Sequence, residues 1–386
     1  MTSPLMKALI LDSNNKSAFV QAIPRPVPQA GEVLIRVHVV ALNPVDSLYV
    51  ANPLGTTGRT VGSDFSGTIL ETTSSRLRPG QKVAGFLQGA CSVNDRPGAF
   101  AEFLVCPEDL LWTIPDSMTL EEAATVSLCA LTAAQGLFYR LGLKAPFDWA
   151  QDESPKRDDS LVGGTASFTF FVYGASTSVG MYAAQLVRWS AKATGAVIRL
   201  IGAASPAKFP VLQAEPYGYD VLVDYRDSLW PQQVVASTGG TGVDYAYDCI
   251  SEGQTVKLVG STLRDGGKIA VVRSKEGGAF DSQGLDTQPI YGAVWEGLGV
   301  GIQYHKMLVP ASAEAREFAT CFYRWLSGQH RLVANPIRLM PGGMERIVPD
   351  GFALLGSGSM TDRPQPRHEP WMKPISGEKL VYRITD

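Results

Sequence analysis

The sequence has few of the residues that build metal centres. Its four histidines stand apart, and none is paired with another at a spacing typical of a metal site. They are His38, His305, His330 and His368. The five cysteines are odd in number, widely spaced and form no C-x-x-C pair. They are Cys91, Cys106, Cys129, Cys249 and Cys321. We therefore expect reduced thiols and no bound metal.

Strong charge and long apolar runs are also missing. The 386 residues carry a net charge of only -3, with a sequence pI near 5.9, so no basic face predicts nucleic-acid or anionic-lipid binding. No stretch reaches the roughly 18 uninterrupted apolar residues of a membrane span, and the start "MTSPLMKALILDSNN" has no apolar core after its lysine. These absences favour a cytoplasmic protein that binds neither nucleic acid nor membrane. Its length suggests two or three domains.

Short alternating runs dominate the first part of the chain, at 32–42, 60–70, 81–87 and 98–105. Gly, Pro and Asp bound these runs, a pattern that predicts short strands in a small, largely antiparallel barrel. The pattern changes at 121–143, where alanine and leucine after a capping Thr119 predict one long, mostly buried helix. This first unit ends near there.

Strand-like and helix-like segments alternate after a polar segment at 144–166, which we interpret as a surface loop. Apolar strands are expected at 167–173, 196–202, 220–225, 243–250 and 266–272, and helices at 179–193, 228–237 and 253–264. This alternation predicts an α/β doubly wound parallel sheet. The tail departs from it, with a helix at 312–327, strands at 337–340 and 377–384, and a Pro/Arg-rich insert at 359–374. We expect the tail to pack back on the first unit.

The stretch "FVYGASTSVG" at 171–180 reads as a strand, a turn and a helix. Such a turn holds a dinucleotide pyrophosphate on backbone N–H groups, and glycines let the phosphate approach. Gly174 and Gly180 frame this turn, but its centre is Ser176, Thr177 and Ser178. The three hydroxyls suit two interpretations, hydrogen bonds to phosphate or an ordinary helix cap.

The end of the next strand predicts which dinucleotide binds. NAD sites carry an acidic residue there for the ribose 2'-hydroxyl, and NADP sites lack it. Residues 197–209 contain no carboxylate, whereas Ser205 and Lys208 could contact a 2'-phosphate. A lysine on a solvated loop is the alternative. The missing acid favours NADPH over NADH.

Several motifs taken together resemble the medium-chain dehydrogenase/reductase superfamily. They are "NPVD" at 43–46, "GSDFSGTI" at 62–69, "PGQKVAGF" at 79–86, "GAFAEFLV" at 98–105, "IPDSMTLEEAATVSL" at 114–128 and "VYGASTSVG" at 172–180. The Ser-Thr centre of the turn, "VDYR" at 223–226, "DCI" at 248–250 and "SGEKLVYRI" at 376–384 are most similar to the trans-acting enoyl reductases of fungal polyketide biosynthesis, the lovastatin enoyl reductase type.

The resemblance implies a GroES-like β-barrel catalytic domain at 1–135 and 310–386, and a Rossmann domain at 136–309. It implies hydride transfer from NADPH to the β carbon of an enoyl thioester on the carrier protein of a polyketide synthase, by a monomer or weak dimer. The zinc alcohol dehydrogenases of the superfamily have Gly-His-Glu where this chain has Gly62, Ser63 and Asp64, and a four-cysteine lobe that it lacks. The resemblance therefore implies chemistry at a C=C bond without zinc.

Site residues are carried over by position from the resemblance. Those implied for the cofactor are Ser176, Thr177, Ser178 and Val179 at the pyrophosphate, Ser205 and Lys208 at the 2'-phosphate, Tyr225 at the adenine, Ile250 at the nicotinamide, and Val45, Asp46, Ser47, Leu48, Leu380 and Val381. Those implied for the substrate are Thr125, Leu128 and Thr132. Sheet packing is the alternative for Tyr225 and Ile250, and a bond to its own helix is the alternative for Thr132.

Two positions depart from the lovastatin relative, which has lysine where Leu48 stands and asparagine where Glu252 stands. No side chain is identified as the acid, and solvent is the expected source of the α proton. Two other functions stay open: a diffusible quinone or enone reductase, and a reductase-like protein that keeps the cofactor fold without this turnover.

Overall fold

The computed structural model describes residues 4–149, 167–328, 332–358, 362 and 367–385. The chain forms two compact units, with Met1–Leu128 and Trp295–Asp386 in unit 1 and Cys129–Val294 in unit 2. The domain limits drawn from the sequence, at 135/136 and 309/310, stay a prediction. The insert at 359–374 and the loop at 144–166 lie partly outside the described residues.

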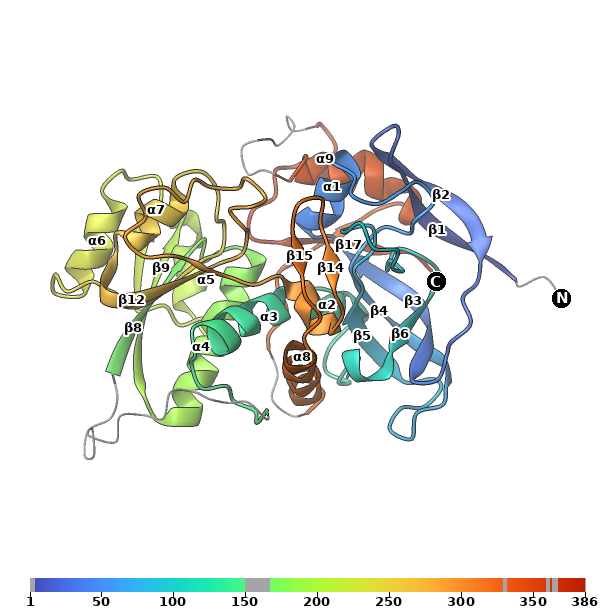
Figure 1. The fold of residues 1–386 in the computed structure, drawn as a ribbon, viewed down its shortest axis with the longest axis horizontal. Helices are drawn as coiled ribbons and strands as arrows, with labels where there is room; N and C mark the ends of the chain where they lie inside the picture. Colours follow the sequence, from blue (N-terminus) through green and yellow to red (C-terminus); the bar gives the residue numbers. More distant parts are fainter. Residues whose placement is uncertain (1–3, 150–166, 329–331, 359–361, 363–366, 386) are drawn as a thin grey trace. The chain divides into compact units, whose positions relative to one another are not determined.

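Unit 2 contains one six-stranded sheet (Figure 1). Its strands are β8 (Ser167–Tyr173), β9 (Val197–Ala204), β10 (Val221–Asp224), β11 (Val243–Asp248), β12 (Leu263–Val271) and β13 (Ile290–Tyr291). They lie in the order β10-β9-β8-β11-β12-β13, and every neighbouring pair is parallel. This is the doubly wound dinucleotide-binding order, and its direction reverses between β8 and β11. The predicted sheet is confirmed.

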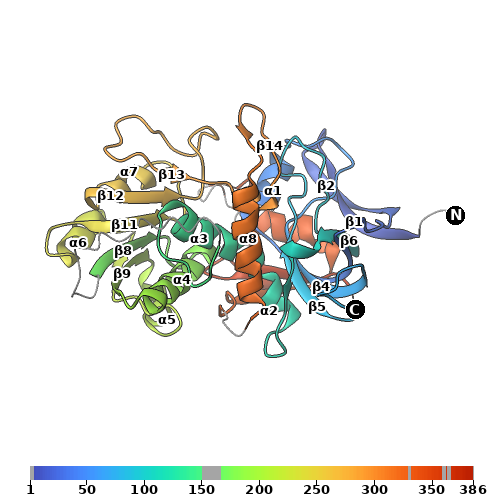
Figure 2. The same ribbon diagram turned by 60° about the horizontal axis from the view of Figure 1, so that its bottom comes forward.

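Strand β8 is apolar on both faces, as a central parallel strand requires. Phe171 packs against Trp230 with their ring centres 5.7 Å apart, while Phe170 and Val172 are buried on the opposite face. The helices that accompany the sheet are α4 (Ser178–Thr194), α5 (Phe209–Gln213), α6 (Trp230–Ser237) and α7 (Thr255–Gly260). Figure 2 shows α4 and α5 near β8 and β9, and α7 beside β12.

The single helix predicted at 121–143 is wrong. The structure has α2 (Leu120–Ala124), α3 (Ser127–Ala134) and a π-helical turn (Gln135–Arg140). Thr119 caps α2 as predicted, because its Oγ1 accepts the N–H of Glu122. The break lies at Thr125 and Val126, and Leu128 near the start of α3 donates its N–H to Asp64 Oδ1 at 2.9 Å.

Unit 1 is built around β3 (Glu32–Ala41), which pairs antiparallel with three strands. The sheet runs β16 (Ile337–Met340), β17 (Lys379–Arg383), β3, β4 (Asp64–Thr72), β5 (Lys82–Phe86) and β7 (Trp112–Thr113), and β6 (Phe103–Pro107) also pairs with β3. Only the pair β16–β17 is parallel among these. The largely antiparallel character predicted for this unit is therefore confirmed.

A hairpin of β1 (Leu5–Asp12) and β2 (Ser17–Pro24) was left unassigned in the sequence. This hairpin explains why β4 and β6 begin later in the chain than the strands predicted at 60–70 and 98–105. Val61 donates its N–H to the Leu9 carbonyl, and Leu9 donates to the Phe100 carbonyl, so the segments before β4 and β6 bind β1 instead of the main sheet.

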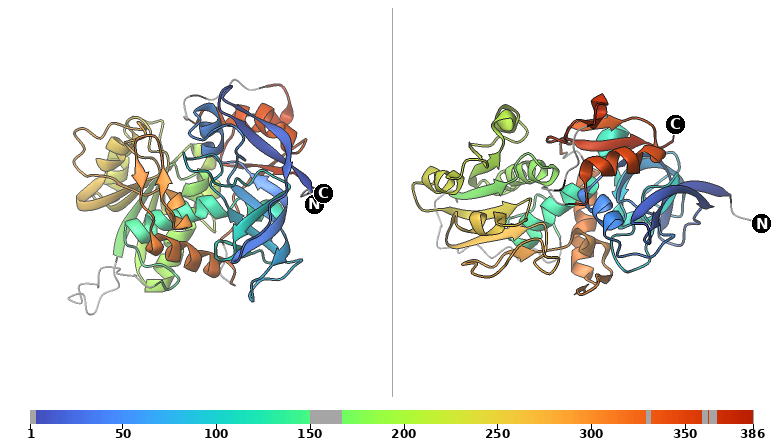
Figure 3. Two further views of the ribbon diagram at one scale, coloured as in Figure 1. Left: turned by 45° about the vertical axis from the view of Figure 1, so that its right-hand side comes forward. Right: turned by 90° about the horizontal axis from the view of Figure 1, so that it is seen from above.

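The tail returns to unit 1 as predicted, because β17 pairs with β3. Unit 1 also holds α1 (Pro44–Ala51), β14 (Ile302–Gln303), β15 (Leu308–Val309), α8 (Ala313–Leu326) and α9 (Ala353–Leu355). Figure 3 shows the blue β1–β2 hairpin and the red C-terminal segments of this unit. No helix among the described residues is long and apolar enough to cross a membrane.

Candidate functional site

The turn between β8 and α4 requires both of its glycines. Gly174 has φ +76°, which side chains disfavour, and a Cβ on Gly180 would stand 2.3 Å from the Gly174 carbonyl oxygen. Ala175 donates its N–H to the Ala203 carbonyl and so ties the turn to β9. The turn is closed on itself by close backbone packing.

Thr177 caps the helix. Its Oγ1 accepts the N–H of Gly180 at 3.0 Å and donates to the Gly174 carbonyl at 2.8 Å, and its own N–H donates to the same carbonyl. The hydroxyl proton and the amide proton of Thr177 are therefore both used inside the turn. Of the two interpretations left open for this hydroxyl, the hydrogen bonds support the helix cap and give no support to a phosphate contact.

Ser176, Ser178 and Val179 differ from Thr177. In the part of the chain that the structure describes, no hydrogen bond uses their N–H groups or the two serine hydroxyls, and all three residues are half-buried. They stand at the N-terminus of the 17-residue helix α4, where the peptide dipoles favour negative charge. Three amides and two hydroxyls are thus available for an anion.

The ends of β9 and β10 lie side by side, since Ala204 pairs with Asp224. This register brings Ser205 close to Tyr225, whose side chain is 46% exposed and so is not packed in the sheet. Arg226 donates to the two carboxylate oxygens of Asp224 at 3.0 and 3.1 Å, and these bonds lower the pKa of that carboxyl. Arg226 is a second cation beside this edge, and it was not among the predicted cofactor residues.

Lys208 follows Ser205 in a short 3-10 turn (Pro206–Lys208), in which its N–H donates to the Ser205 carbonyl at 2.8 Å. The turn places the lysine at the same end of β9 as Ser205. Both residues are half-buried.

Ile250 lies against the phosphate turn. Its Cγ1 would be 3.1 Å from a Cβ on Gly174. Asp248 positions it, because Oδ1 accepts the N–H groups of Ile250 and Ser251 at 2.9 and 2.8 Å, and Oδ2 accepts the Thr255 hydroxyl at 2.6 Å. Asp248 was not singled out from the sequence, although an aspartate followed by Ser and Thr in a loop is a known turn signal.

Glu252, the second departure from the lovastatin relative, forms an ion pair with Arg273 at 2.7 Å. The Glu252 carboxylate therefore has a cationic partner within unit 2.

Unit 1 holds a buried polar network at the start of α1. Asn43 Nδ2 donates to Ser63 Oγ at 3.0 Å and to Asp64 Oδ2 at 2.9 Å, and Ser63 Oγ donates to Asp46 Oδ1 at 2.9 Å. Asp46 Oδ2 accepts the Asn43 N–H at 2.8 Å. Lys379 Nζ donates to Asp64 Oδ2 at 2.5 Å. Both oxygens of Asp46 are thus used within unit 1.

The network holds two carboxylates, Asp46 and Asp64, against one cation, Lys379. Burial raises the pKa of Asp46 to about 7, against the lowering effect of the Asn43 N–H and the Ser63 hydroxyl. The Asp46 carboxyl therefore changes its charge in the neutral range. Lys379 was not among the predicted site residues, and its only signal in the sequence is that it begins an apolar strand.

The network and β17 fix the segment that carries the other predicted cofactor residues. Leu42 donates its N–H to the Leu380 carbonyl at 2.9 Å, and Val381 is buried opposite Ala41. Ser47 is buried and bonds the Pro44 carbonyl. Val45 and Leu48 are half-buried on α1.

The predicted substrate residues fall in both units. Thr125 and Leu128 belong to unit 1, where Thr125 Oγ1 donates to the Glu122 carbonyl and the Thr125 carbonyl accepts Lys379 Nζ at 3.3 Å. Thr132 belongs to unit 2, and its carbonyl accepts the Tyr247 hydroxyl at 3.0 Å. Helix α3 carries the chain from one unit to the other.

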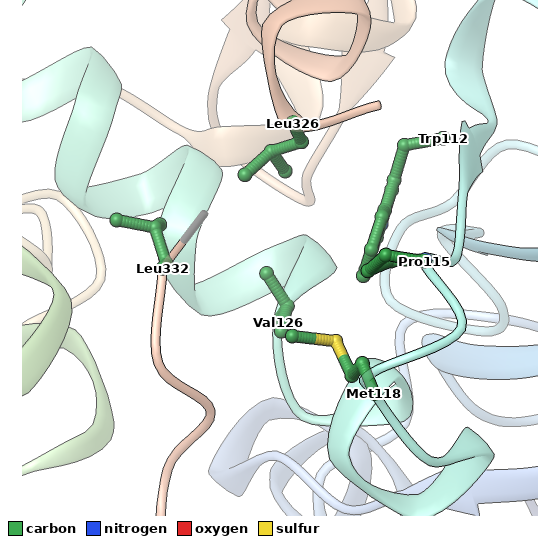
Figure 4. Close-up of a pocket in the computed structure, with 6 residues that line it drawn as sticks. All are labelled: Trp112, Pro115, Met118, Val126, Leu326 and Leu332. Atoms are coloured by element: carbon green, nitrogen blue, oxygen red, sulfur yellow. The ribbon is translucent and has the colours of Figure 1, made fainter. Parts of the chain in front are cut away.

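A small apolar hollow in unit 1 is drawn in Figure 4. Its volume of about 10 Å³ is near the minimum for one water molecule, so it offers no room for a substrate. Its lining residues are Trp112, Pro115, Met118, Val126, Leu326 and Leu332. Among the described residues, no group of three or more His, Cys, Asp or Glu side chains could hold a metal ion.

Replacement of Thr177 should affect stability through the helix cap. We expect Thr177→Ala to lower the free energy of unfolding by about 1 kcal/mol, and Thr177→Ser to retain it. Ser176→Ala is the matched control and should stay within about 0.5 kcal/mol of the parent. Urea denaturation measures all three, and equal midpoints for Thr177→Ala and Ser176→Ala would refute the cap.

Asp46 should make stability depend on pH. The native state keeps its proton up to about pH 7, and the unfolded chain releases it near 3.8, so the native state binds more protons in between. The contribution of the protonated Asp46 carboxyl to stability is complete below the pKa of the unfolded chain, and it is lost as the pH rises toward the native pKa. The free energy of unfolding should therefore fall by about 1.4 kcal/mol per pH unit between about pH 4 and 7.

Asp46→Asn should remove this contribution, because the amide does not titrate. Other groups titrate in both proteins, so the difference between the two urea-denaturation profiles is the quantity to measure. Parallel profiles from pH 4.5 to 7.5 would contradict the assignment.

Comparison with known families supports the two-unit description. Residues 29–116 match the alcohol dehydrogenase GroES-like domain, and residues 178–290 match the zinc-binding dehydrogenase family. Among solved structures, the CurK enoyl reductase superposes with a TM-score of 0.68 at 18% identity over 98% of this chain and 99% of that one. The quinone oxidoreductase from Coxiella burnetii gives 0.65 at 19% identity over 99% and 100%. These likenesses show the fold.

Sequence relatives are more specific. The trans-enoyl reductase thnE of Trichoderma harzianum is 30% identical over 380 residues, which cover 93% of this chain and 91% of the relative. The trans-enoyl reductase ACTTS2 of Alternaria alternata is 29% identical over 98% of both chains. The resemblance predicted from the sequence is confirmed. This identity along nearly the whole of both chains shows that the protein belongs to the trans-enoyl reductases of the medium-chain dehydrogenase/reductase superfamily.

Proposed function

We propose that this enoyl reductase uses NADPH to reduce an α,β-unsaturated thioester that the carrier protein of a partner polyketide synthase presents. Enoyl reduction follows from the family. The proposal adds two points to the family assignment, namely the cofactor NADPH and a substrate bound to a carrier protein. The observation that supports it is the donor-rich turn at the start of α4.

The turn suits a pyrophosphate. The N–H groups of Ser176, Ser178 and Val179 have no partner within the described residues, and the missing side chains of Gly174 and Gly180 allow the close backbone packing. An anion at this helix end would satisfy donors that the fold leaves over and would interact with the positive end of the helix.

Charge at the neighbouring strand end supports NADPH over NADH. Ser205 and Lys208 follow β9, where no carboxylate stands, and Arg226 neutralises Asp224 at the end of β10. A dianionic 2'-phosphate would there meet cations and hydroxyls, whereas the ribose of NADH would find no acidic partner on β9.

Bound NADPH supplies the hydride, which is delivered to the β carbon. The task of the chain is to orient the reactants. Asp248 fixes the loop that carries Ile250, the proposed nicotinamide-side wall, and the Asn43–Asp46–Ser63 hydrogen bonds fix α1 with Val45 and Leu48. We assign no side chain to the α proton and propose solvent as its source.

A substrate comparison tests the reaction. NADPH oxidation should be faster with an enoyl thioester than with a simple quinone, and NADH should be at least about tenfold less effective, as expected for about 1.4 kcal/mol of 2'-phosphate recognition. Preference for the quinone would favour a diffusible quinone reductase. NADPH binding without oxidation by either substrate would indicate a homologue that no longer performs this reaction.

A fluorescence titration tests the phosphate turn. Ser176→Ala combined with Ser178→Ala removes two hydroxyl donors and should weaken NADPH binding by about 1 to 3 kcal/mol. Thr177→Ser is the matched control, because it keeps the cap, and its affinity should match that of the parent. Unchanged affinity in the double variant would mean that the hydroxyls do not bind phosphate.

The predicted cytoplasmic location and the monomeric or weakly dimeric state stay predictions.

A further inference from the structure

Strand β2 has one edge on which no strand is paired. It pairs antiparallel with β1 along its whole length. The other edge of β1 is occupied, because Leu9 donates its N–H to the Phe100 carbonyl at 2.8 Å. Among the described residues no strand follows β2, and Figure 1 shows the β1–β2 hairpin at the margin of unit 1. The hairpin therefore ends the sheet with an open strand.

The pairing decides which backbone groups of β2 face this open edge. Arg25 donates its N–H to the Pro4 carbonyl at 2.9 Å, so this pair and every second pair along the hairpin exchange hydrogen bonds between β1 and β2. Val20 and Ala22 lie in the alternate pairs, and their N–H and C=O groups turn away from β1. No hydrogen bond within the described part of the chain uses these groups.

The edge is accessible to solvent. Residues 19–23 are all exposed or half-buried, and the Phe19 side chain is 48% exposed. The accessible stretch is limited at both ends, because Ala18 is buried and Pro24 has no N–H to offer. We call residues 19–23 the open edge.

The open edge lacks the features that usually keep an edge strand from pairing. Natural edge strands are protected by lysines, other charged side chains, prolines or bulges. Residues 17–23, SAFVQAI, contain no charged residue and no proline, and their register with β1 is uninterrupted. Alternating backbone donors and acceptors on such an edge are complementary to another extended strand.

The open edge is complementary to a second copy of itself. When two copies run antiparallel about Gln21, Val20 of each copy lies opposite Ala22 of the other, and each of these pairs exchanges two backbone hydrogen bonds. On the opposite face of the strands Phe19 then lies opposite Ile23 of the second copy, and Gln21 lies opposite Gln21. Apolar side chains thus meet each other, and no like charges are brought together.

We propose that two copies of this chain associate edge to edge through residues 19–23, in an antiparallel pairing centred on Gln21. The pairing joins the two β1–β2 hairpins into one four-stranded sheet. Only one short strand of each copy takes part, so the interface is far smaller than the roughly 1,600 Å² of a standard protein–protein interface. The dimer is therefore weak and reversible, with a Kd on the order of 0.1 mM.

A charge exchange at Gln21 tests the pairing and its register. Gln21→Lys and Gln21→Glu each place like charges directly opposite each other in the symmetric dimer, so each variant alone should show a Kd raised about five- to tenfold. An equimolar mixture of the two should associate at least as tightly as the parent, because opposite charges then meet. Sedimentation velocity measures each Kd. Gln232→Lys, which changes an exposed glutamine outside β2, is the matched control and should leave the Kd unchanged.

A proline at Ala22 tests the backbone hydrogen bonds. Ala22→Pro removes an outward N–H without breaking a bond inside the hairpin, and it should raise the Kd at least about tenfold. Ala22→Ser keeps the N–H and should retain the Kd of the parent. In the parent, hydrogen exchange at the amides of Val20 and Ala22 should slow as the protein concentration rises through the Kd.

A parent that stays monomeric up to about 1 mM, ten times the expected Kd, would overturn the proposal. A dimer whose Kd is the same in the parent and in both Gln21 variants would overturn the open edge as its interface. Weakened association that the mixture does not restore would overturn the pairing about Gln21. Should Ala22→Pro fail to fold, the Gln21 exchange still decides, because Gln21 is exposed. Protection of the Val20 and Ala22 amides that requires a polyketide synthase would assign the edge to that partner and overturn self-association.

Discussion

The buried ion pair between Lys379 and Asp64 is the interaction on which unit 1 depends. It joins β17, at the end of the chain, to β4, and Asp64 also holds the Asn43 side chain and the Leu128 N–H. Each atom of the pair has further partners, which is what makes two buried charges tolerable. Without Lys379, two carboxylates would remain buried together, a situation that costs about 3 to 5 kcal/mol in known buried pairs. The pair is thereby linked to the residue that precedes α1 and to the first turn of α3.

In unit 2, too, single side chains hold several polar groups of the backbone in place. Asp248 satisfies the N–H groups of the loop after β11, and Thr177 satisfies the first turn of α4. These two residues thus satisfy three N–H groups near the phosphate turn. The amides of Ser176, Ser178 and Val179 are left over among the described residues, and they point to where an anion belongs. Residues whose polar atoms are already hydrogen-bonded within the protein therefore position the site. Residues whose polar atoms are not used in this way are the ones that we propose to bind the cofactor.

Much of the fold could be predicted from the sequence because its signals are local. The apolar run at 167–173 and the "IRLM" run at 337–340 match β8 and β16 residue for residue. The single helix predicted at 121–143 was wrong, and the Asp64 carboxylate that accepts the Leu128 N–H near the start of α3 lies 64 residues earlier in the chain, beyond any local pattern. Lys379 and Asp64 are 315 residues apart in the sequence, so no local pattern could predict their ion pair.

The phosphate turn was recognised from its spacing, but its chemistry was not resolved. Three adjacent hydroxyls look alike in the sequence, and only the direction of the Thr177 side chain toward Gly174 and Gly180 separates the cap from its neighbours.

The buried cations Lys379 and Arg59 of unit 1 differ in their counter-charges. Lys379 has its carboxylate partner, Asp64, fully buried beside it, so both charges lose their hydration together and compensate each other in a medium of low dielectric constant. Arg59 is almost as deeply buried, yet the Asp95 carboxylate that stands 3.4 Å from its Nε is 95% exposed. The Lys379–Asp64 pair is therefore fixed on both sides by the fold, whereas Asp95 keeps most of its hydration and compensates the charge of Arg59 only weakly.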